Sequence, residues 1–425
     1  MVGLLLVFCI GIWLGRKSPP WLRGSTVVNY VGSYLPSERS DTTKSVARGI
    51  THRQILDNGV LTNILAVSPD AIDIRPYRAL SAGIGTESLV SLARRHKALA
   101  AINGGFFEMV GTLRGESVGA LKIDGEWISE PEQGRAVIGL RTVDGNIEAY
   151  IDRIILRQKL VLPSGETLAI DGMNRSRGRN ELVIYRPDFH TVTLTMPDGV
   201  EVVVRNGEVT GIRDREGSSR IPADGYILSA SGKKRTDLLT HIAEGDAVQI
   251  HEMVIPERVG DSNLWASFVH IIGGGPLLLQ DGTAPPTQAY EREGFNQAFH
   301  SFWHPRTAIG KKADGTLLFV TITAAAAGVR RGVKLARLAE LFLEWEATDA
   351  LNLDGGNSST LVIRGEVVSV KQKDRARAKS DDKAEPKKVG TERNRRTARG
   401  NRRIRPPPRQ QGRAIADAIL IFSRF

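Results

Sequence analysis

LNLDGGNSSTLVIRGEVV, residues 351–368, places an acid, two glycines and three small polar residues between two aliphatic segments. An ordinary β-hairpin needs only two turn residues, such as Asn-Gly, so this loop carries more polar groups than a turn requires. Asp354 stands at its start, and is either a turn-closing residue or a reactive group of a site. The pattern indicates a buried strand, a polar glycine loop and a second buried strand.

Two other segments share this design. Apolar strands end at Asn103-Gly104-Gly105 and at Gly273-Gly274-Gly275-Pro276. Glycine lets a backbone approach a ligand closely and turn its N–H groups toward one point, although glycine at a strand end also serves tight turns. Because three such loops occur in one chain, we expect them to line one site.

FWHPRTAIG, residues 302–310, adds an arginine to this set. Arg306 follows Pro305, and its planar fork suits an anion, although a structural salt bridge is the alternative. Three roles stay open for His304, namely a catalytic acid, a hydrogen-bond donor or a loop residue without a role in the site. We therefore expect this segment to lie beside the glycine loops.

Seven segments of the chain follow one another in a characteristic order. They are AINGGFF (101–107), GALKIDGEW (119–127), IGGGPLLLQDG (272–282), HPRTAIG (304–310), LARLAELF (335–342), ALNLDGGNSSTLV (350–362) and GRAIADAILIF (412–422). In this order they resemble the phosphodiester glycosidases, a family of N-acetylglucosamine-1-phosphodiester α-N-acetylglucosaminidase-like proteins and bacterial exopolysaccharide-biosynthesis relatives. The resemblance spans roughly 98–425. It implies an α+β fold of mixed β-sheets with few helices, in which glycine-rich loops at strand ends form the site.

The resemblance also implies a reaction and its residues. The reaction is hydrolysis of a sugar-1-phosphodiester to a sugar and a phosphomonoester, in cell-surface or exopolysaccharide metabolism. The residues carried over are Asn103, Gly104, Gly105, His304, Arg306, Thr307, Asp354, Gly355, Gly356, Ser359 and Thr360. From the glycine loops we add Gly274, Gly275 and Asn357 as substrate-binding candidates.

Catalysis is expected to need more than one group. Glycoside hydrolysis usually uses two carboxyl groups, and a phosphate monoester leaves more easily when an arginine stabilises its charge. Asp354, Arg306 and His304 are therefore the catalytic candidates, with Glu108 as the second carboxylate or else a solvated loop residue.

Two departures from the family pattern bear on activity. Asn357 stands where many members have glycine, and Ala324 to Ala327 stand where an Asp-Gly-Arg is usual. If the missing acid or arginine binds substrate, activity is weakened or specificity differs. A non-catalytic glycan-binding protein on the same fold is therefore an alternative.

Other chemistries find little support. GESVG (115–119) matches the serine-hydrolase motif, but a strand-like segment follows it where that motif needs a helix. Cys9 is the only cysteine, and no pair of histidines has zinc-ligand spacing. We expect no metal and no cofactor, and a cation at Asp354 stays open.

The net charge of +11 comes from one segment. Residues 371–412 contain 16 Lys or Arg and 5 Asp or Glu, so the rest of the chain is neutral. This composition favours a disordered insertion between two strands. It predicts attraction to an anionic polymer or membrane surface and no specific nucleic-acid partner. An anionic-polymer binder is thus a second alternative function.

The remaining organisation follows from hydropathy. Residues 1–24 carry a 14-residue apolar run, typical of a signal peptide or short membrane anchor unless the start codon is mis-set, so we expect an extracytoplasmic protein. A linker is expected at 25–50 and one domain at 51–425, with a strand-rich middle at 145–260. Strands are expected at 59–67, 71–80, 99–103, 119–128, 268–282, 316–323 and 414–422, and helices at 86–98, behind Thr86, and at 333–347.

Overall fold

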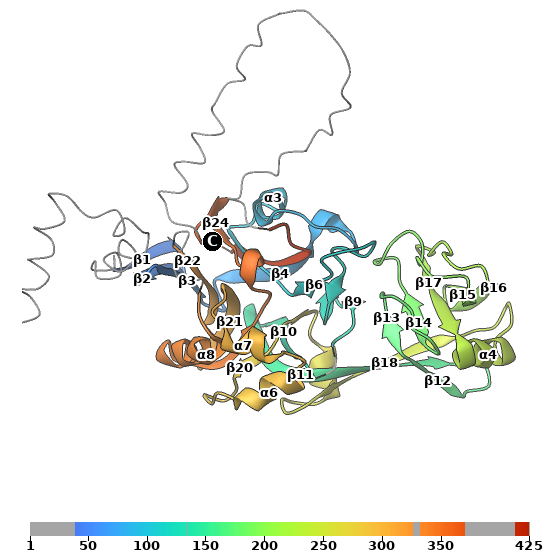
Figure 1. The fold of residues 1–425 in the computed structure, drawn as a ribbon. Coiled ribbons are helices and arrows are strands. Elements are labelled where there is room, and N and C mark those ends of the chain that lie inside the picture. The colour runs from blue at the N-terminus through green and yellow to red at the C-terminus, as the bar shows by residue number, and fades with distance from the viewer. Residues whose placement is uncertain (1–38, 133, 326–331, 370–412, 425) are drawn as a thin grey trace, which may run out of the picture. The chain divides into compact units, whose positions relative to one another are not determined.

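The computed structural model describes residues 39–132, 134–325, 332–369 and 413–424 (Figure 1). The described residues from Ser40 onward form a compact unit of their own. The predictions for residues 1–24, for Ala326 and Ala327 and for the segment 371–412 lie outside the described residues. The described part is rich in strands and has few helices, as the sequence predicted.

The first sheet is antiparallel and has seven strands in the order β1-β2-β3-β22-β21-β23-β20. Their bounds are β1 Ser40–Ala47, β2 Ile50–Asp57, β3 Val60–Val67, β20 Leu277–Leu279, β21 Arg306–Lys312, β22 Leu317–Ala324 and β23 Ala347–Asn352. β3 and β22 pair along their whole lengths. The predicted strands at 59–67 and 316–323 thus form adjacent central strands, which explains their continuous apolar character.

The second sheet has five strands in the order β25-β24-β5-β26-β4. Their bounds are β4 Ile72–Arg78, β5 Ala100–Asn103, β24 Leu361–Ile363, β25 Glu366–Val367 and β26 Asp417–Ser423. β26 lies between β4 and β5 and pairs with both in antiparallel fashion. The C-terminal strand is therefore set beside the first glycine loop, which follows β5.

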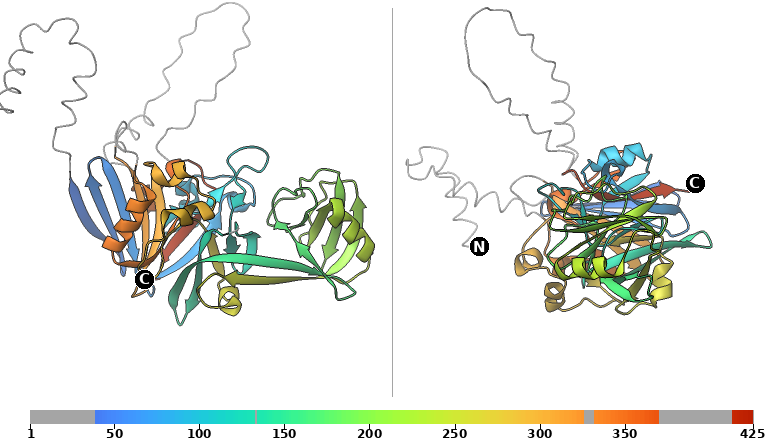
Figure 2. Two further views of the ribbon diagram at one scale, coloured as in Figure 1. Left: turned by 60° about the horizontal axis from the view of Figure 1, so that its bottom comes forward. Right: turned by 90° about the vertical axis from the view of Figure 1, so that its right-hand side faces the viewer.

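The third sheet has the order β12-β11-β10-β19-β8-β9, with β18 paired to β11. Its bounds are β8 Leu121–Ile123, β9 Glu126–Ser129, β10 Ala136–Val143, β11 Asn146–Val161, β12 Thr167–Ile170, β18 Gln249–Pro256 and β19 His270–Gly273. The long β11 pairs with β10 through its first half and with β18 through its second half. It thereby carries the chain from the sheets near the glycine loops to the strand-rich middle (Figure 2).

Within the strand-rich middle, a separate five-stranded sheet has the order β13-β14-β17-β15-β16. Its bounds are β13 Gly172–Met173, β14 Leu182–Tyr185, β15 Gly199–Arg205, β16 Glu208–Asp214 and β17 Gly225–Ser231. The short strands β6 Phe106–Phe107 and β7 Ser117–Val118 form a further pair. The prediction of strands throughout 145–260 missed helix α4, Gly232–His241, which buries Leu238 and no other residue and so lacks an apolar stripe.

One apolar core joins the first three sheets. It includes Leu65 of β3, Ile102 of β5 and Ile138 of β10, all without exposure to solvent. Helix α8 packs on the outer face of the first sheet through Leu335, Leu338, Ala339 and Phe342. The helices in the described part are α3 Leu89–Arg95, α4, α5 Ser262–Ala266, α6 Thr287–Arg292, α7 Gln297–Ser301 and α8 Leu335–Glu344, with 3₁₀ turns η2 Ala79–Ser81 and η3 Gly356–Ser358.

Two boundary predictions were wrong. The linker expected at 25–50 contains β1 and the start of β2, because β1 is a mostly exposed, polar edge strand with no alternation to mark it. Ser88 caps the first helix in place of Thr86, since its hydroxyl accepts the Ser91 N–H at 3.2 Å. Within the described ranges, no helix has the length and apolar character needed to cross a membrane.

Candidate active site

The three glycine loops meet at the ends of β5, β19 and β23. The Asp354 N–H donates to the Gly104 carbonyl at 3.2 Å, and the Gly275 N–H donates to the Asn352 carbonyl at 2.7 Å. A Cβ on Gly274 would lie 2.4 Å from the Asn352 oxygen. The loops therefore pack backbone against backbone, and a close approach between main chains requires glycine here.

We call the place where the three glycine loops meet the junction, and Asn103 links its loops by hydrogen bonds. Its Nδ2 donates to the Asp354 carbonyl at 2.7 Å, and its Oδ1 accepts the Thr307 hydroxyl at 2.9 Å and the Thr360 N–H at 3.1 Å. All three predicted residues, Asn103, Thr307 and Thr360, are at most 2 % exposed. The structure places them together, in contacts with protein groups that fix the loops.

Asp354 is the partly accessible carboxyl of the junction, with 13 % of its side chain exposed. Its Oδ2 lies 3.1 Å from Nη2 of Arg413, which also donates to the Ser358 hydroxyl at 2.6 Å. Burial raises the pKa of Asp354 above its ordinary value, and Ser358 and Arg413 oppose that rise. The group is thus an acid whose protonation depends on one neighbouring cation.

The rest of the 354–360 loop is a 3₁₀ turn around this carboxyl. Gly355 packs against the Pro305 carbonyl, which accepts the Gly356 N–H at 2.9 Å. Asn357 is exposed, and its carbonyl accepts the Arg413 N–H at 3.0 Å. The Ser359 hydroxyl is buried and has no hydrogen-bond partner among the described residues.

Asp417 is a second carboxyl at the junction, which the sequence reasoning missed. It is 3 % exposed, and it accepts the Gly105 N–H at 2.8 Å and the Ser117 hydroxyl at 3.1 Å. Burial, and to a lesser degree the charge of Asp354, raise its pKa to about 6. A Cβ on Gly104 would lie 2.0 Å from its Oδ1. The one available signal was an acid inside the otherwise apolar segment AIADAILIF.

Arg306 lies in a different environment from the one its motif suggested. Its side chain is buried, its Nη2 donates to the Phe299 carbonyl at 2.6 Å and its Nε donates to the Val333 carbonyl at 3.2 Å. Burial lowers its pKa to about 10. The neighbouring His304 is partly exposed, and its Nε2 lies 3.4 Å from the Ala298 carbonyl. The guanidinium thus holds the chain around α7 in place.

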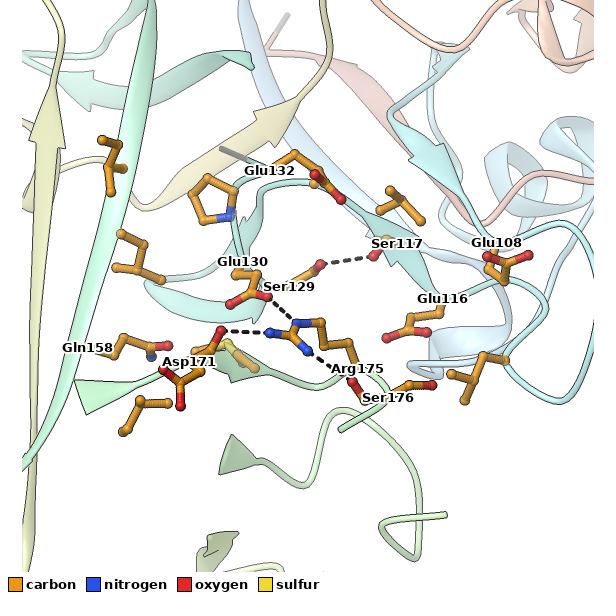
Figure 3. Close-up of a pocket in the computed structure, with 18 of the residues that line it drawn as sticks. Glu108, Glu116, Ser117, Ser129, Glu130, Glu132, Gln158, Asp171, Arg175 and Ser176 are labelled. Atoms are coloured by element: carbon orange, nitrogen blue, oxygen red, sulfur yellow. Dashed lines mark hydrogen bonds and ion pairs between the residues drawn. The ribbon is translucent and has the colours of Figure 1, made fainter. Parts of the chain in front are cut away.

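A cavity of about 1050 Å³ lies next to the junction. Ser117 and Glu108 both line it (Figure 3). Ser117 is the residue that donates to Asp417. The Glu108 carboxylate accepts the N–H groups of Met109 and Val110. The structure therefore places Glu108 at the cavity wall, with its Oε1 bonded to its own loop.

Acidic side chains line much of this cavity. Burial, with a smaller contribution from Glu108, raises the pKa of Glu116 to about 8. Glu130 bonds Arg175 at 2.6 Å across the wall (Figure 3). Among the described residues, no group of three or more His, Cys, Asp or Glu is arranged to hold a metal ion.

A strand-rich fold that presents a partly exposed carboxyl beside an arginine, with a second carboxyl behind it, has the groups that a hydrolytic site needs. The sequence profile of the phosphodiester glycosidase family matches residues 198–422 of the 425-residue chain. The chain belongs to this family. The match begins in the middle portion and includes Arg306, Asp354, Arg413 and Asp417.

Individual relatives are more distant. The N-acetylglucosamine-1-phosphodiester α-N-acetylglucosaminidase of Homo sapiens is 31% identical over 170 residues, which are 39% of this chain and 33% of that protein. An uncharacterized protein of Rickettsia conorii is 25% identical over 238 residues, which are 54% of this chain and 77% of that protein. The chain thus spans about a third of the length of the human relative it matches.

Two solved structures share the fold. A hypothetical protein from Synechocystis superposes with a TM-score of 0.71 at 23% identity, over 91% of this chain and 64% of that one. A protein from Burkholderia pseudomallei whose given name describes it as exported superposes with a TM-score of 0.66 at 21% identity, over 87% and 74% of the two chains.

Proposed function

We propose that this protein hydrolyses a glycosyl phosphodiester by cleaving the bond between the anomeric carbon and the phosphate oxygen. Water adds to the sugar carbon, the bonding electrons leave with the phosphate oxygen, and the products are a sugar and a phosphomonoester. The observation that carries this proposal is the pairing of Asp354 with Arg413 at 3.1 Å on the loops shared with the family. An acid and a cation at this separation suit a bond between a sugar and an anionic leaving group.

Asp354 is the carboxyl placed to touch the substrate, because Asp417 is almost completely covered. In its protonated form Asp354 gives its proton to the leaving phosphate oxygen. Its raised pKa supports this role, since more of the acid form is then present near neutral pH. Glu108, at the wall of the neighbouring cavity, remains our candidate for the carboxylate that activates water.

The test uses the purified protein and a panel of methyl phosphodiesters of glucose, mannose and N-acetylglucosamine 1-phosphates in both anomeric forms. Reducing sugar is measured in water enriched in ¹⁸O. Cleavage at the sugar carbon is expected to place ¹⁸O in the sugar. Label in the phosphomonoester would instead identify a phosphodiesterase and overturn the proposal.

The matched variants are Asp354→Asn and Asp144→Asn. Asp144 lies in an exposed turn with φ 48°, a conformation that asparagine also adopts readily. We expect turnover to fall at least 100-fold in Asp354→Asn and to be unchanged in Asp144→Asn. Wild-type turnover in a folded Asp354→Asn protein would reduce Asp354 to a turn residue.

We further propose that the protein acts outside the cytoplasm on cell-surface or exopolysaccharide material. The apolar run before residue 16 and the given name of the Burkholderia pseudomallei structure support this proposal. A fusion of residues 1–50 to alkaline phosphatase, which is active only after export, tests it. A fusion without phosphatase activity would contradict export.

A further inference from the structure

Two arginines of the site region differ in what their guanidinium groups contact. Arg306 is 1 % exposed, and carbonyl groups of Phe299 and Val333 accept hydrogen bonds from it. Its guanidinium carbon also lies 4.9 Å from the centre of the Phe299 ring. A buried guanidinium with these neutral partners holds protein segments together.

Arg413 differs from Arg306 because 30 % of its side chain is exposed and its guanidinium contacts Asp354, the carboxyl that we propose touches the substrate. Nη2 donates to Asp354 and Ser358, whereas Nη1 has the weakly accepting sulfur of Met109, at 2.7 Å, as its one partner among the described residues. Nε is buried and has no hydrogen-bond partner in the described part of the chain. Two of the three guanidinium nitrogens therefore lack a good acceptor among the residues that the structure describes.

Arg413 is also held in place for a ligand. Its backbone N–H is bonded to the Asn357 carbonyl at 3.0 Å, and its guanidinium carbon lies 5.1 Å from the centre of the Phe107 ring. These contacts fix the side chain over the loop without using Nη1 or Nε. An arginine that is fixed and incompletely bonded is preorganised to accept an anion.

We propose that Arg413, and not Arg306, binds the phosphate group of the substrate. This assignment rests on the proposed function. A phosphate oxygen displaces the Met109 sulfur from Nη1, and a second oxygen reaches Nη2, which gives the two parallel hydrogen bonds that a guanidinium offers an oxyanion. Met109 is 54% exposed, so it can move toward solvent.

Phosphate binding and proton binding are then coupled. The charged side chains that act on Asp354 and Asp417 within the described junction are Arg413 and these two acids themselves. When phosphate takes Nη2, Asp354 loses its cation and gains a negative neighbour, so it binds a proton from solvent. That proton is the one that Asp354 later gives to the leaving oxygen.

The experiment measures binding of inorganic phosphate and methyl phosphate to the full chain by titration calorimetry, independently of hydrolysis. The variants are Arg413→Lys, Arg306→Lys and the control Arg337→Lys, on the exposed face of α8. All three keep residues 371–412, so any diffuse attraction by that segment cancels in the comparison. Thermal unfolding of each variant is recorded in parallel.

We expect Arg413→Lys to weaken phosphate binding at least tenfold with little change in thermal midpoint, because a point charge does not replace a bidentate fork. Arg306→Lys is expected to lower the midpoint while the folded protein binds phosphate as the wild type does. Arg337→Lys is expected to change neither. Proton uptake on binding, measured in buffers of different ionisation enthalpy, is expected in the wild type and not in Asp354→Asn.

The proposal is overturned if the wild type binds neither probe, if Arg413→Lys keeps wild-type affinity, or if folded Arg306→Lys loses it. Arg413-dependent phosphate binding without hydrolysis of any diester would leave the assignment standing and remove the proposed function. Hydrolysis with a KM that Arg413→Lys does not alter would leave the proposed function standing and remove the assignment of Arg413 to the phosphate.

Discussion

Asp417→Asn tests whether the junction holds a buried negative charge at the cost of stability. Asp417 is 3 % exposed, and burial raises its pKa from 3.8 to about 6. At about 1.4 kcal/mol for each pKa unit, this rise corresponds to about 3 kcal/mol. The charged carboxylate therefore lowers the free energy of unfolding by an amount of that order near neutral pH.

The sign of the pH dependence follows from linkage. Between pH 3.8 and about 6 the folded protein binds the Asp417 proton more tightly than the unfolded chain does. The contribution of this carboxyl to stability is therefore complete below pH 3.8 and is lost as the pH rises through about 6. Asparagine cannot ionise, so the variant escapes this loss, and its Oδ1 still accepts the Gly105 N–H.

We expect the variant to match the wild type within about 1 kcal/mol at pH 4 and to be more stable by up to about 3 kcal/mol at pH 7.5. Urea unfolding at pH steps from 4 to 8 measures the difference, in which the titrations of groups that do not interact with Asp417 cancel. Asp144→Asn serves as the control. A difference that does not change with pH, or a variant less stable than the wild type at pH 7.5, would refute the reasoning.

Two further substitutions probe the loops and the basic segment. Gly104→Ala, whose Cβ would meet Asp417 Oδ1 at 2.0 Å, is expected to cost about 1–3 kcal/mol in urea unfolding. Gly211→Ala has open space and should cost far less; equal costs would contradict the close packing. A short Gly-Ser linker in place of 371–412 should preserve the thermal midpoint and small-substrate turnover. It should abolish salt-sensitive retention on an anionic matrix, and a collapsed midpoint or unchanged retention would contradict these expectations.

The elements that the sequence predicted best are those whose burial is regular. The segment 333–347 has one apolar stripe, and α8 buries the Leu335, Leu338, Ala339 and Phe342 of that stripe. The strand predicted at 99–103 corresponds to β5, Ala100–Asn103, in which every residue is buried. In both cases the local pattern and the tertiary environment agree, so periodicity alone was sufficient.

The site itself was only partly predictable. Loop positions such as Asn103 and Asp354 were visible because glycines and polar residues interrupt apolar strands. The direction of the Arg306 guanidinium was not visible, since it depends on where α7 and Val333 lie in the fold. Asp417 was hidden for the same reason, because its partners come from the loop after β5 and from β7.

The polar residues of the loop after β23 differ in what they contact. Ser358 accepts a hydrogen bond from Arg413, and Thr360 bonds Asn103, so both stabilise the arrangement around Asp354. Ser359 differs, because its buried hydroxyl has no partner among the described residues. A buried unsatisfied hydroxyl costs about 1–3 kcal/mol. Ser359 lies in the same loop as Asp354, so the loop keeps one polar group that none of the described residues satisfies.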